Sequence, residues 1–259
     1  MSVKMPAVFL GHGNPMNALE HNRYGDAWER FADDAPRPKA ILAISAHWYV
    51  PMSAVTAMQE PRTIHDFSGF PDELFALEYP APGDPLLAAR VAELLSPTEI
   101  ALDAETWGLD HGTWSVLSHL YPEADIPVVQ LSLHAGEPLS YHLALGEALA
   151  PLREEGIMIV ASGNVVHNLS LMDLSQQNRA AAWARRFDEA AREFMVRDPA
   201  SLAELAQLPE YPLAVPTPEH FLPLAYLAGL AQAAGGGVRT LIEGYDRGSL
   251  SMTSYVLDN

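Results

Sequence analysis

The chain contains no cysteine and carries little positive charge. Without cysteine, disulfide bonds, thiolate metal sites and a cysteine nucleophile are excluded, so any metal ion must be held by nitrogen or oxygen atoms. The 15 lysines and arginines stand against 33 aspartates and glutamates, which gives a formal net charge of −18. Because such a surface repels phosphate backbones and anionic lipids, we expect neither nucleic acid nor a membrane as a partner.

Long apolar runs are also missing from the sequence. No run approaches the roughly 20 residues that a membrane-spanning helix requires. The apolar run at residues 7–10 is too short for the core of a signal peptide, and a glycine follows it. We therefore expect a cytoplasmic protein. Hydrophobic residues make up 49% of the 259 residues, which is enough to form one large core.

Short β-rich runs alternate with stretches of helical periodicity. Two runs, 41–44 and 157–160, are apolar at every position, which is typical of central strands covered on both faces. The alternation predicts a single three-layer α/β/α domain over residues 1–259, with a mixed, largely parallel central sheet. Strands are predicted at 7–10, 40–45, 54–58, 127–133, 157–161, 238–243 and 249–257, the last of them an edge or antiparallel strand. Helices are predicted at 85–95, 113–120, 139–152, 177–196 and 221–234.

Three of the 10 histidines follow predicted strands. His12 comes directly after the first strand, His47 directly after the second, and His167 shortly after the strand at 157–161. Ligands of open α/β sheets bind beyond the carboxyl ends of the strands, so we expect the three imidazoles to converge there. Each of them alone is compatible with an ordinary loop residue that caps a backbone carbonyl. Three together favour a metal site at the carboxyl ends of the strands.

Three further histidines lie in distinctive loops. His220 lies in a proline-rich turn that enters a predicted helix, where it is suited either to hold a metal or to form an ordinary helix start. Its neighbour Glu219 is an alternative ligand. His111 lies between two tryptophans, and His65 precedes Asp66. Both are typical of a titratable group in an apolar pocket, and equally of a loop histidine paired with a neighbouring aspartate.

Six short segments contain these histidines. They are Gly11-His12-Gly13-Asn14-Pro15, Ser45-Ala46-His47-Trp48, Thr63-Ile64-His65-Asp66-Phe67, Leu109-Asp110-His111-Gly112-Thr113-Trp114, Ser162-Gly163-Asn164-Val165-Val166-His167-Asn168 and Pro218-Glu219-His220-Phe221. In this order they resemble the DOPA 4,5-dioxygenase branch of the class III extradiol ring-cleavage dioxygenases. The resemblance continues to residues 249–253, so it covers nearly the whole chain.

The resemblance implies an α/β fold and one divalent metal ion per chain, Zn²⁺ or Fe²⁺. By this resemblance His12, His47 and His220 are metal ligands. His167 matches a histidine that acts as a base or joins the metal ligands when substrate is absent. His111 matches a second acid/base histidine. Most class III enzymes have a carboxylate in place of the third histidine, and an all-nitrogen set suits zinc as well as iron.

The resemblance also implies a small catecholic substrate such as DOPA, which O₂ opens next to, not between, its two hydroxyl groups. His65, Trp48 and Phe67 are then expected to bind the substrate. Two other functions remain open on the residues alone. One is a zinc hydrolase that uses Glu219 or Asp66 as general base, although the sequence lacks the His-Glu-x-x-His pattern. The other is a non-catalytic metal-binding protein. The sequence does not indicate an oligomeric state.

Overall fold

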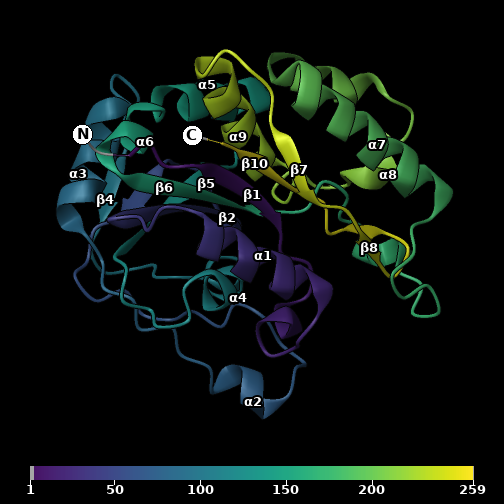
Figure 1. The fold of residues 1–259 in the computed structure, drawn as a ribbon, viewed down its shortest axis with the longest axis horizontal. Helices are drawn as coiled ribbons and strands as arrows, with labels where there is room; N and C mark the ends of the chain where they lie inside the picture. Colours follow the sequence, from purple (N-terminus) through teal and green to yellow (C-terminus); the bar gives the residue numbers. More distant parts are fainter. Residues whose placement is uncertain (1–2, 259) are drawn as a thin grey trace.

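A mixed eight-stranded sheet forms the centre of the computed structural model, which describes residues 3–258 (Figure 1). Its strands are β1 (Ala7–Gly11), β2 (Ala40–Val50), β3 (Ala54–Thr56), β4 (Ala101–Asp103), β5 (Val128–His134), β6 (Ile157–Gly163), β7 (Arg239–Ile242) and β10 (Ser254–Leu257). The spatial order is β4-β3-β5-β2-β6-β1-β10-β7. The four central strands β5, β2, β6 and β1 pair in parallel, and antiparallel pairs flank them on both sides. The predicted mixed, largely parallel sheet is therefore confirmed.

Helices cover both faces of this sheet. They are α1 (Arg23–Asp34), α2 (Asp72–Phe75), α3 (Pro85–Leu94), α4 (His111–Leu120), α5 (Leu139–Ala148), α6 (Pro151–Glu155), α7 (Ala182–Arg197), α8 (Tyr211–Ala214) and α9 (Leu222–Ala233), with the 3-10 helices η1 (Pro15–Ala18), η2 (Leu169–Leu171) and η3 (Pro199–Gln207). In Figure 1, α5 and α9 lie on one side of the sheet, and α1 and α4 lie on the other. A separate two-stranded sheet joins β8 (Tyr245–Asp246) to β9 (Leu250–Ser251).

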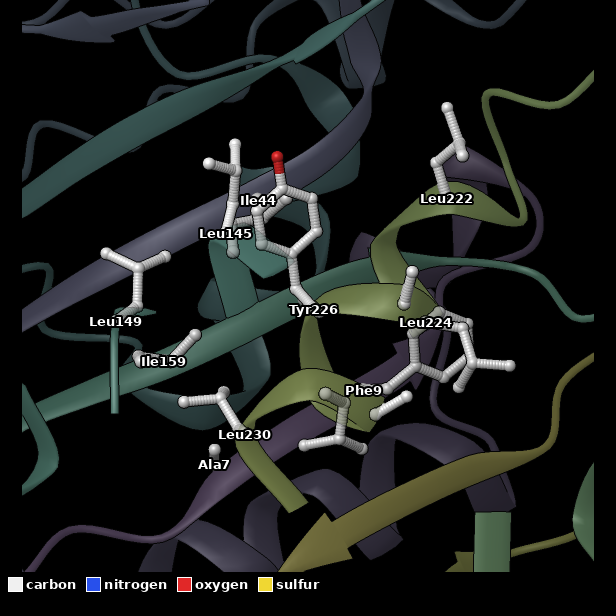
Figure 2. Packing of buried hydrophobic residues seen from close by; sticks show 14 of the residues in the cluster. Ala7, Phe9, Ile44, Leu145, Leu149, Ile159, Leu222, Leu224, Tyr226 and Leu230 are labelled. Atoms are coloured by element: carbon white, nitrogen blue, oxygen red, sulfur yellow. The ribbon is translucent and has the colours of Figure 1, made fainter. Parts of the chain in front are cut away.

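Side chains of the central strands alternate between two apolar cores. Phe9 of β1 belongs to the core on one face, which also contains Tyr226 and Leu230 of α9 (Figure 2). Its neighbour Leu10 points the other way, into a core that contains Trp28 of α1. This alternation follows from the two-residue repeat of a strand, and it gives the three layers that the sequence predicts. The single domain expected over residues 1–259 remains a prediction, and residues 1–2 and 259 lie outside the described part.

Helix α1 is absent from the predicted elements, although its sequence contains an N-cap residue and an apolar face. Asn22 accepts hydrogen bonds from the backbone amides of Tyr24 and Gly25, as a helix N-cap does. Trp28 and Phe31 bury its apolar face. Charged residues make up half of the segment and Gly25 interrupts it, so its apolar stripe is narrow and does not give a helix prediction.

Two predicted elements are interrupted in the structure. The helix expected at 139–152 is divided into α5 and α6, because Pro151 has no backbone N–H and begins a new helix. The strand expected at 249–257 is divided into β9 and β10. Strand β10 is antiparallel to both β1 and β7, so it lies inside the sheet and not at its edge.

Within residues 3–258 no helix has the length and apolar character to cross a membrane. The cytoplasmic location expected from the sequence stays a prediction.

Candidate metal centre

His12 and His47 lie at the carboxyl ends of two parallel strands, because β1 and β2 both pair in parallel with β6. The β1–β6 pairing ends at Gly11 and the β2–β6 pairing ends at Ser45. His12 therefore follows the end of β1, as predicted. His47 lies inside β2, which continues to Val50, and not after it. The pairing of β2 with β5 is irregular across this stretch, and such bulges redirect side chains toward a site.

A close backbone contact brings His220 to the same carboxyl ends of the strands. The carbonyl of His220 accepts a hydrogen bond of 2.8 Å from the amide of Asn164, just after β6. Only glycine fits at position 163 without a shift of the backbone, since a Cβ atom there would overlap the His220 carbonyl oxygen. His167 follows on the same loop, and its amide donates to the carbonyl of Ala214 at 2.9 Å. The end of β6 thus positions both histidines.

Three imidazoles converge in front of these strand ends. The Nε2 atoms of His12 and His47 lie 3.2 Å apart. The ring centre of His220 lies 5.4 Å from that of His12 and 5.0 Å from that of His47. One ring nitrogen of each residue lies within 4.8 Å of those of the other two. Two nitrogens that bind one ion at about 2.1 Å are about 3.0–3.4 Å apart, so the His12–His47 spacing suits a shared ion.

The environment of His12 fixes which ring nitrogen carries the proton. Its Nδ1 lies 2.9 Å from the hydroxyl oxygen of Ser162. That hydroxyl donates its own proton to the carbonyl of Gly112 at 2.5 Å, so it accepts from His12. The proton of the neutral imidazole is therefore on Nδ1, and the lone pair on Nε2 faces His47.

The other two imidazoles are held in the same way. His47 Nδ1 lies 3.1 Å from a carboxylate oxygen of Asp66, and His220 Nδ1 lies 3.2 Å from a carboxylate oxygen of Glu219. With a proton on each Nδ1, three Nε2 lone pairs face a common space. A cation between them removes their mutual repulsion, and acceptors at Nδ1 are the usual outer partners of metal-binding histidines. The residues present therefore fit a divalent metal ion.

Burial keeps these imidazoles in the form that binds a metal. Burial and the nearby His47 lower the pKa of His12 well below its ordinary value. Burial and the nearby His167 do the same to the pKa of His220. Both rings are consequently neutral at pH 7, and only a neutral imidazole has a free lone pair for a metal.

His167 stacks on His220 instead of joining the group of three. The two ring centres lie 3.5 Å apart and the planes differ by 3°. Together with Glu219 they form another of the three groups whose candidate ligand atoms lie within 4.8 Å of one another; the remaining group is His47, Asp66 and His111. Burial lowers the pKa of His167 to about 4, although Glu219 opposes this shift. A neutral imidazole that can accept a proton therefore lies beside the three converging rings.

The carboxylate of Asp66 connects this centre to His111. One oxygen accepts hydrogen bonds from the backbone amide and from Nδ1 of His111, at 3.0 Å and 2.9 Å. The other accepts from His47 Nδ1. Burial opposes ionisation of Asp66, but these hydrogen bonds outweigh it and hold the pKa of the carboxyl well below its usual range. Since Asp66 occupies Nδ1 of His111, Nε2 is the ring nitrogen left for a ligand.

A cavity of about 270 Å³ opens in front of the histidines. Its lining residues are His12, Gly13, Asn14, Pro15, His47, Phe67, Phe70, His111, His167, Leu169, Met172, His220, Arg247 and Leu250. Apart from the imidazoles, most of this wall is apolar. A few converging polar groups in an apolar cavity are typical of a site for a small molecule.

The structure separates the three residues predicted to bind substrate. Phe67 lines the cavity, with its ring 5.4 Å from that of His111. Trp48 is buried outside the cavity lining and stacks on Trp107 at 5.6 Å. His65 is also outside the lining, and its Nε2 lies 2.9 Å from a backbone carbonyl in the loop before α3.

Sequence reasoning missed several residues of the site. The hydroxyl of Ser162 lies in one of the six histidine segments, but no local pattern indicates its contact with His12. Arg247 and Met172 line the cavity from loops outside those segments, and Leu250 lines it from the predicted strand at 249–257. A turn signal, Arg247 followed by Gly248, was the one local indication of a tight hairpin there.

Three histidines with acceptors at Nδ1, gathered at the carboxyl ends of the parallel strands beside a largely apolar cavity, define a candidate metal site of an α/β protein. Comparison with known proteins identifies the family. Residues 8–257 match the family described as the catalytic LigB subunit of aromatic ring-opening dioxygenase. The chain belongs to this family of extradiol dioxygenases, as the sequence segments predicted. This membership favours ring opening over the hydrolase and the non-catalytic alternatives.

Several named relatives are similar to this chain in sequence over nearly their full length. The 4,5-DOPA dioxygenase extradiol of Escherichia coli (strain K12) is 47% identical over 257 residues, which cover 98% of this chain and 94% of the relative. The 4,5-DOPA dioxygenase extradiol of Beta vulgaris is 36% identical, with coverage of 95% and 94%. That of Portulaca grandiflora is 38% identical, with coverage of 96% and 94%.

A solved structure supports the fold. The crystal structure of an uncharacterized protein from Escherichia coli K12 superposes with a TM-score of 0.84 at 42% sequence identity. The match covers 98% of this chain and 99% of that one. The α/β architecture described above is thus the architecture of an experimentally determined relative.

Proposed function

We propose that this enzyme opens the ring of a small catechol such as DOPA with O₂, at a divalent metal ion bound by His12, His47 and His220. The observation that carries the proposal is the convergence of three imidazole Nε2 atoms whose Nδ1 atoms are all occupied by fixed acceptors. The relatives named 4,5-DOPA dioxygenase support the substrate class.

The proposed metal during turnover is Fe²⁺. A bound divalent ion lowers the pKa of hydroxyl groups that contact it, and iron also supplies the redox chemistry that O₂ requires. Zinc supports the first effect but has no accessible change of oxidation state. The uncharged three-histidine set accepts either ion, so the choice between them depends on metal availability as well as on the ligands.

The remaining polar residues have roles in moving protons. His167 is neutral and lies beside the metal ligands, so we assign it as the base that takes a proton from a catechol hydroxyl. His111 presents Nε2 from the cavity wall while Asp66 fixes its other nitrogen. We assign His111 as an acid/base group whose Nε2 first accepts a proton that the catechol releases and then returns it to an oxygen of the opening ring. The rings of Phe67 and Phe70, 5.3 Å apart, provide an apolar surface for the aromatic substrate.

The test begins with metal-free protein that is loaded anaerobically with Fe²⁺ or with Zn²⁺. A panel of catechols is then added with air, and O₂ uptake and the visible absorbance of a ring-opened semialdehyde are recorded. We expect both signals with Fe²⁺ only. Absence of O₂ uptake with every catechol at full Fe²⁺ loading would refute the proposed function. Ester cleavage with Zn²⁺ in the absence of O₂ would favour a hydrolase instead.

Two variants separate the metal ligands from the proton donor. His12→Ala should lose most metal binding, because two imidazoles remain of three. His111→Ala should retain the metal and lose turnover, since Asp66 holds its Nδ1 and His111 is not one of the three proposed ligands. Metal content measured by atomic emission distinguishes the two outcomes. Metal loss in His111→Ala would show that the roles are assigned incorrectly.

A further inference from the structure

Arg247 is an unusual part of the cavity wall. Of the described residues that line the cavity, it is the only arginine or lysine. Around it the wall is largely apolar, with contributions from Phe67, Phe70, Met172 and Leu250. A guanidinium stays charged at every pH at which a protein is folded. The roles assigned to the histidines for ring opening do not use this charge.

The backbone at Arg247 adopts a conformation that favours glycine. Its φ angle is +49°, and that of Gly248 is +80°. An arginine is rarely found at positive φ, and such residues concentrate at functional sites where the surroundings hold them. Here the Arg247 carbonyl accepts from the amide of Asp173 at 2.9 Å, and the Gly248 amide donates to the carbonyl of Arg179 at 3.0 Å. The turn is thus fixed on both sides.

A buried carboxylate also fixes the β8–β9 hairpin that carries this turn. Asp188 of α7 accepts hydrogen bonds from the hydroxyls of Tyr245 at 2.9 Å, Ser251 at 2.5 Å and Thr253 at 2.8 Å. These three residues lie on both sides of the turn. The position of Arg247 is therefore set before any ligand binds.

Most of the hydrogen-bonding capacity of Arg247 is not used within the protein. In the described chain, its one ion pair joins Nε to a carboxylate oxygen of Asp246 at 3.4 Å. A guanidinium has five N–H donors in a planar fork. Arg247 and Asn14 also line a second, polar depression of about 390 Å³, so they mark the boundary between an apolar space and a polar one.

We propose that Arg247 binds a carboxylate on the side chain of the catechol. The aromatic ring lies in the apolar part of the cavity, near Phe67 and the histidines, and the side chain extends to the polar boundary. The planar fork of Arg247 matches the two oxygens of a carboxylate. Arg247 would then select catechols with a carboxylate-bearing side chain, the class to which the DOPA of the relatives' names belongs. This inference rests on the proposed function and adds the residue of the same site that recognises the carboxylate.

The experiment compares two pairs of catechols that differ in the carboxylate. One pair is DOPA and dopamine; the other is 3-(3,4-dihydroxyphenyl)propanoate and 4-ethylcatechol. The wild-type enzyme should prefer the carboxylate member of each pair by about 10- to 100-fold in kcat/KM, mainly through KM, because the group lies away from the reacting atoms. In Arg247→Met this ratio should fall to near one, and Arg247→Lys should restore part of it.

Two controls separate recognition from folding and from general charge. Arg179→Met removes the same charge from an exposed neighbouring residue outside both cavities, and it should keep the wild-type ratio. Arg247→Gly should lose the ratio while its melting temperature stays equal or rises, since glycine accepts positive φ. Equal preference for both members of each pair in the wild type, or an unchanged ratio in Arg247→Met, would overturn the inference.

A binding measurement keeps this result distinct from failure of the proposed function. If the enzyme opens none of the four catechols, the result counts against the proposed ring cleavage and not against the role of Arg247. Anaerobic calorimetry with 3-(3,4-dihydroxyphenyl)propanoate and 4-ethylcatechol on the Fe²⁺-loaded enzyme still tests the carboxylate. A propanoate preference of tenfold or more that Arg247→Met abolishes supports the role of Arg247, and equal affinities contradict it.

Discussion

Replacing Asp66 by asparagine tests whether the Asp66 carboxylate determines which ring nitrogen of His47 carries the proton. One oxygen of Asp66 accepts two hydrogen bonds from His111, and the other accepts one from His47 Nδ1 at 3.1 Å. In Asp66→Asn one oxygen becomes an NH₂ group. If the NH₂ group pointed toward His111, it would meet the two N–H donors of that residue, the backbone amide and Nδ1. The NH₂ group should therefore face His47. The proton of His47 must then move to Nε2, which removes the lone pair that faces the metal.

The expected loss follows from the strength of a hydrogen bond to a charged group. Such a bond contributes about 1.5–3 kcal/mol, so metal affinity should fall by about 10- to 150-fold. The assay is a competition titration of Fe²⁺ or Zn²⁺ with a chelator of known affinity. The control is Glu29→Gln, because Glu29 pairs with Nδ1 of His119 at 2.9 Å and neither residue lines the cavity. Wild-type metal affinity in Asp66→Asn would refute the reasoning.

Two further predictions concern stability. Burial raises the pKa of Asp188 to about 6 against the hydrogen bonds of its three hydroxyl partners. Because the folded pKa exceeds the unfolded value of about 3.9, the metal-free wild type should lose about 2 kcal/mol of unfolding free energy relative to Asp188→Asn as pH rises from about 4 to about 6. Denaturant titrations at several pH values measure this difference, and parallel pH curves would contradict it. Gly163→Ala should cost about 1–3 kcal/mol and weaken metal binding, since the new methyl group overlaps the His220 carbonyl. Gly236→Ala, where a Cβ meets open space, is its control and should change thermal unfolding little; equal losses in the two variants would exclude the steric explanation.

The positions of the candidate ligands could be predicted because they depend on a topological rule. Parallel strands end at one edge of a sheet, so His12, which follows a strand, was expected to lie near His47. The alternation of a strand also explains why Trp48 lies outside the cavity. His47 and Trp48 are adjacent in β2, so their side chains point to opposite faces. Applying that rule to the sequence would have removed Trp48 from the expected substrate contacts.

The outer partners of the histidines could not be predicted in the same way. Ser162 lies 150 residues from His12 in the sequence, and its role depends on a hydroxyl whose proton is donated elsewhere. Asp66 lies in a loop without regular structure, so no periodicity places it between His47 and His111. Arg247 enters the cavity from a hairpin outside the main sheet. These contacts depend on how distant segments pack, which local patterns do not specify.

The β8–β9 hairpin forms a sheet of its own, yet it is bound directly to the loop that carries His167. Leu250 forms a bridge with His167, and the amide of Ser251 donates to the carbonyl of Val166 at 2.9 Å. The histidines come from the edge of the eight-stranded sheet and its neighbouring loops, whereas Arg247 comes from a two-residue-per-strand hairpin with its own pairing. A substitution that shifts the turn therefore acts at both ends of the cavity, on the wall at Arg247 and on the position of His167.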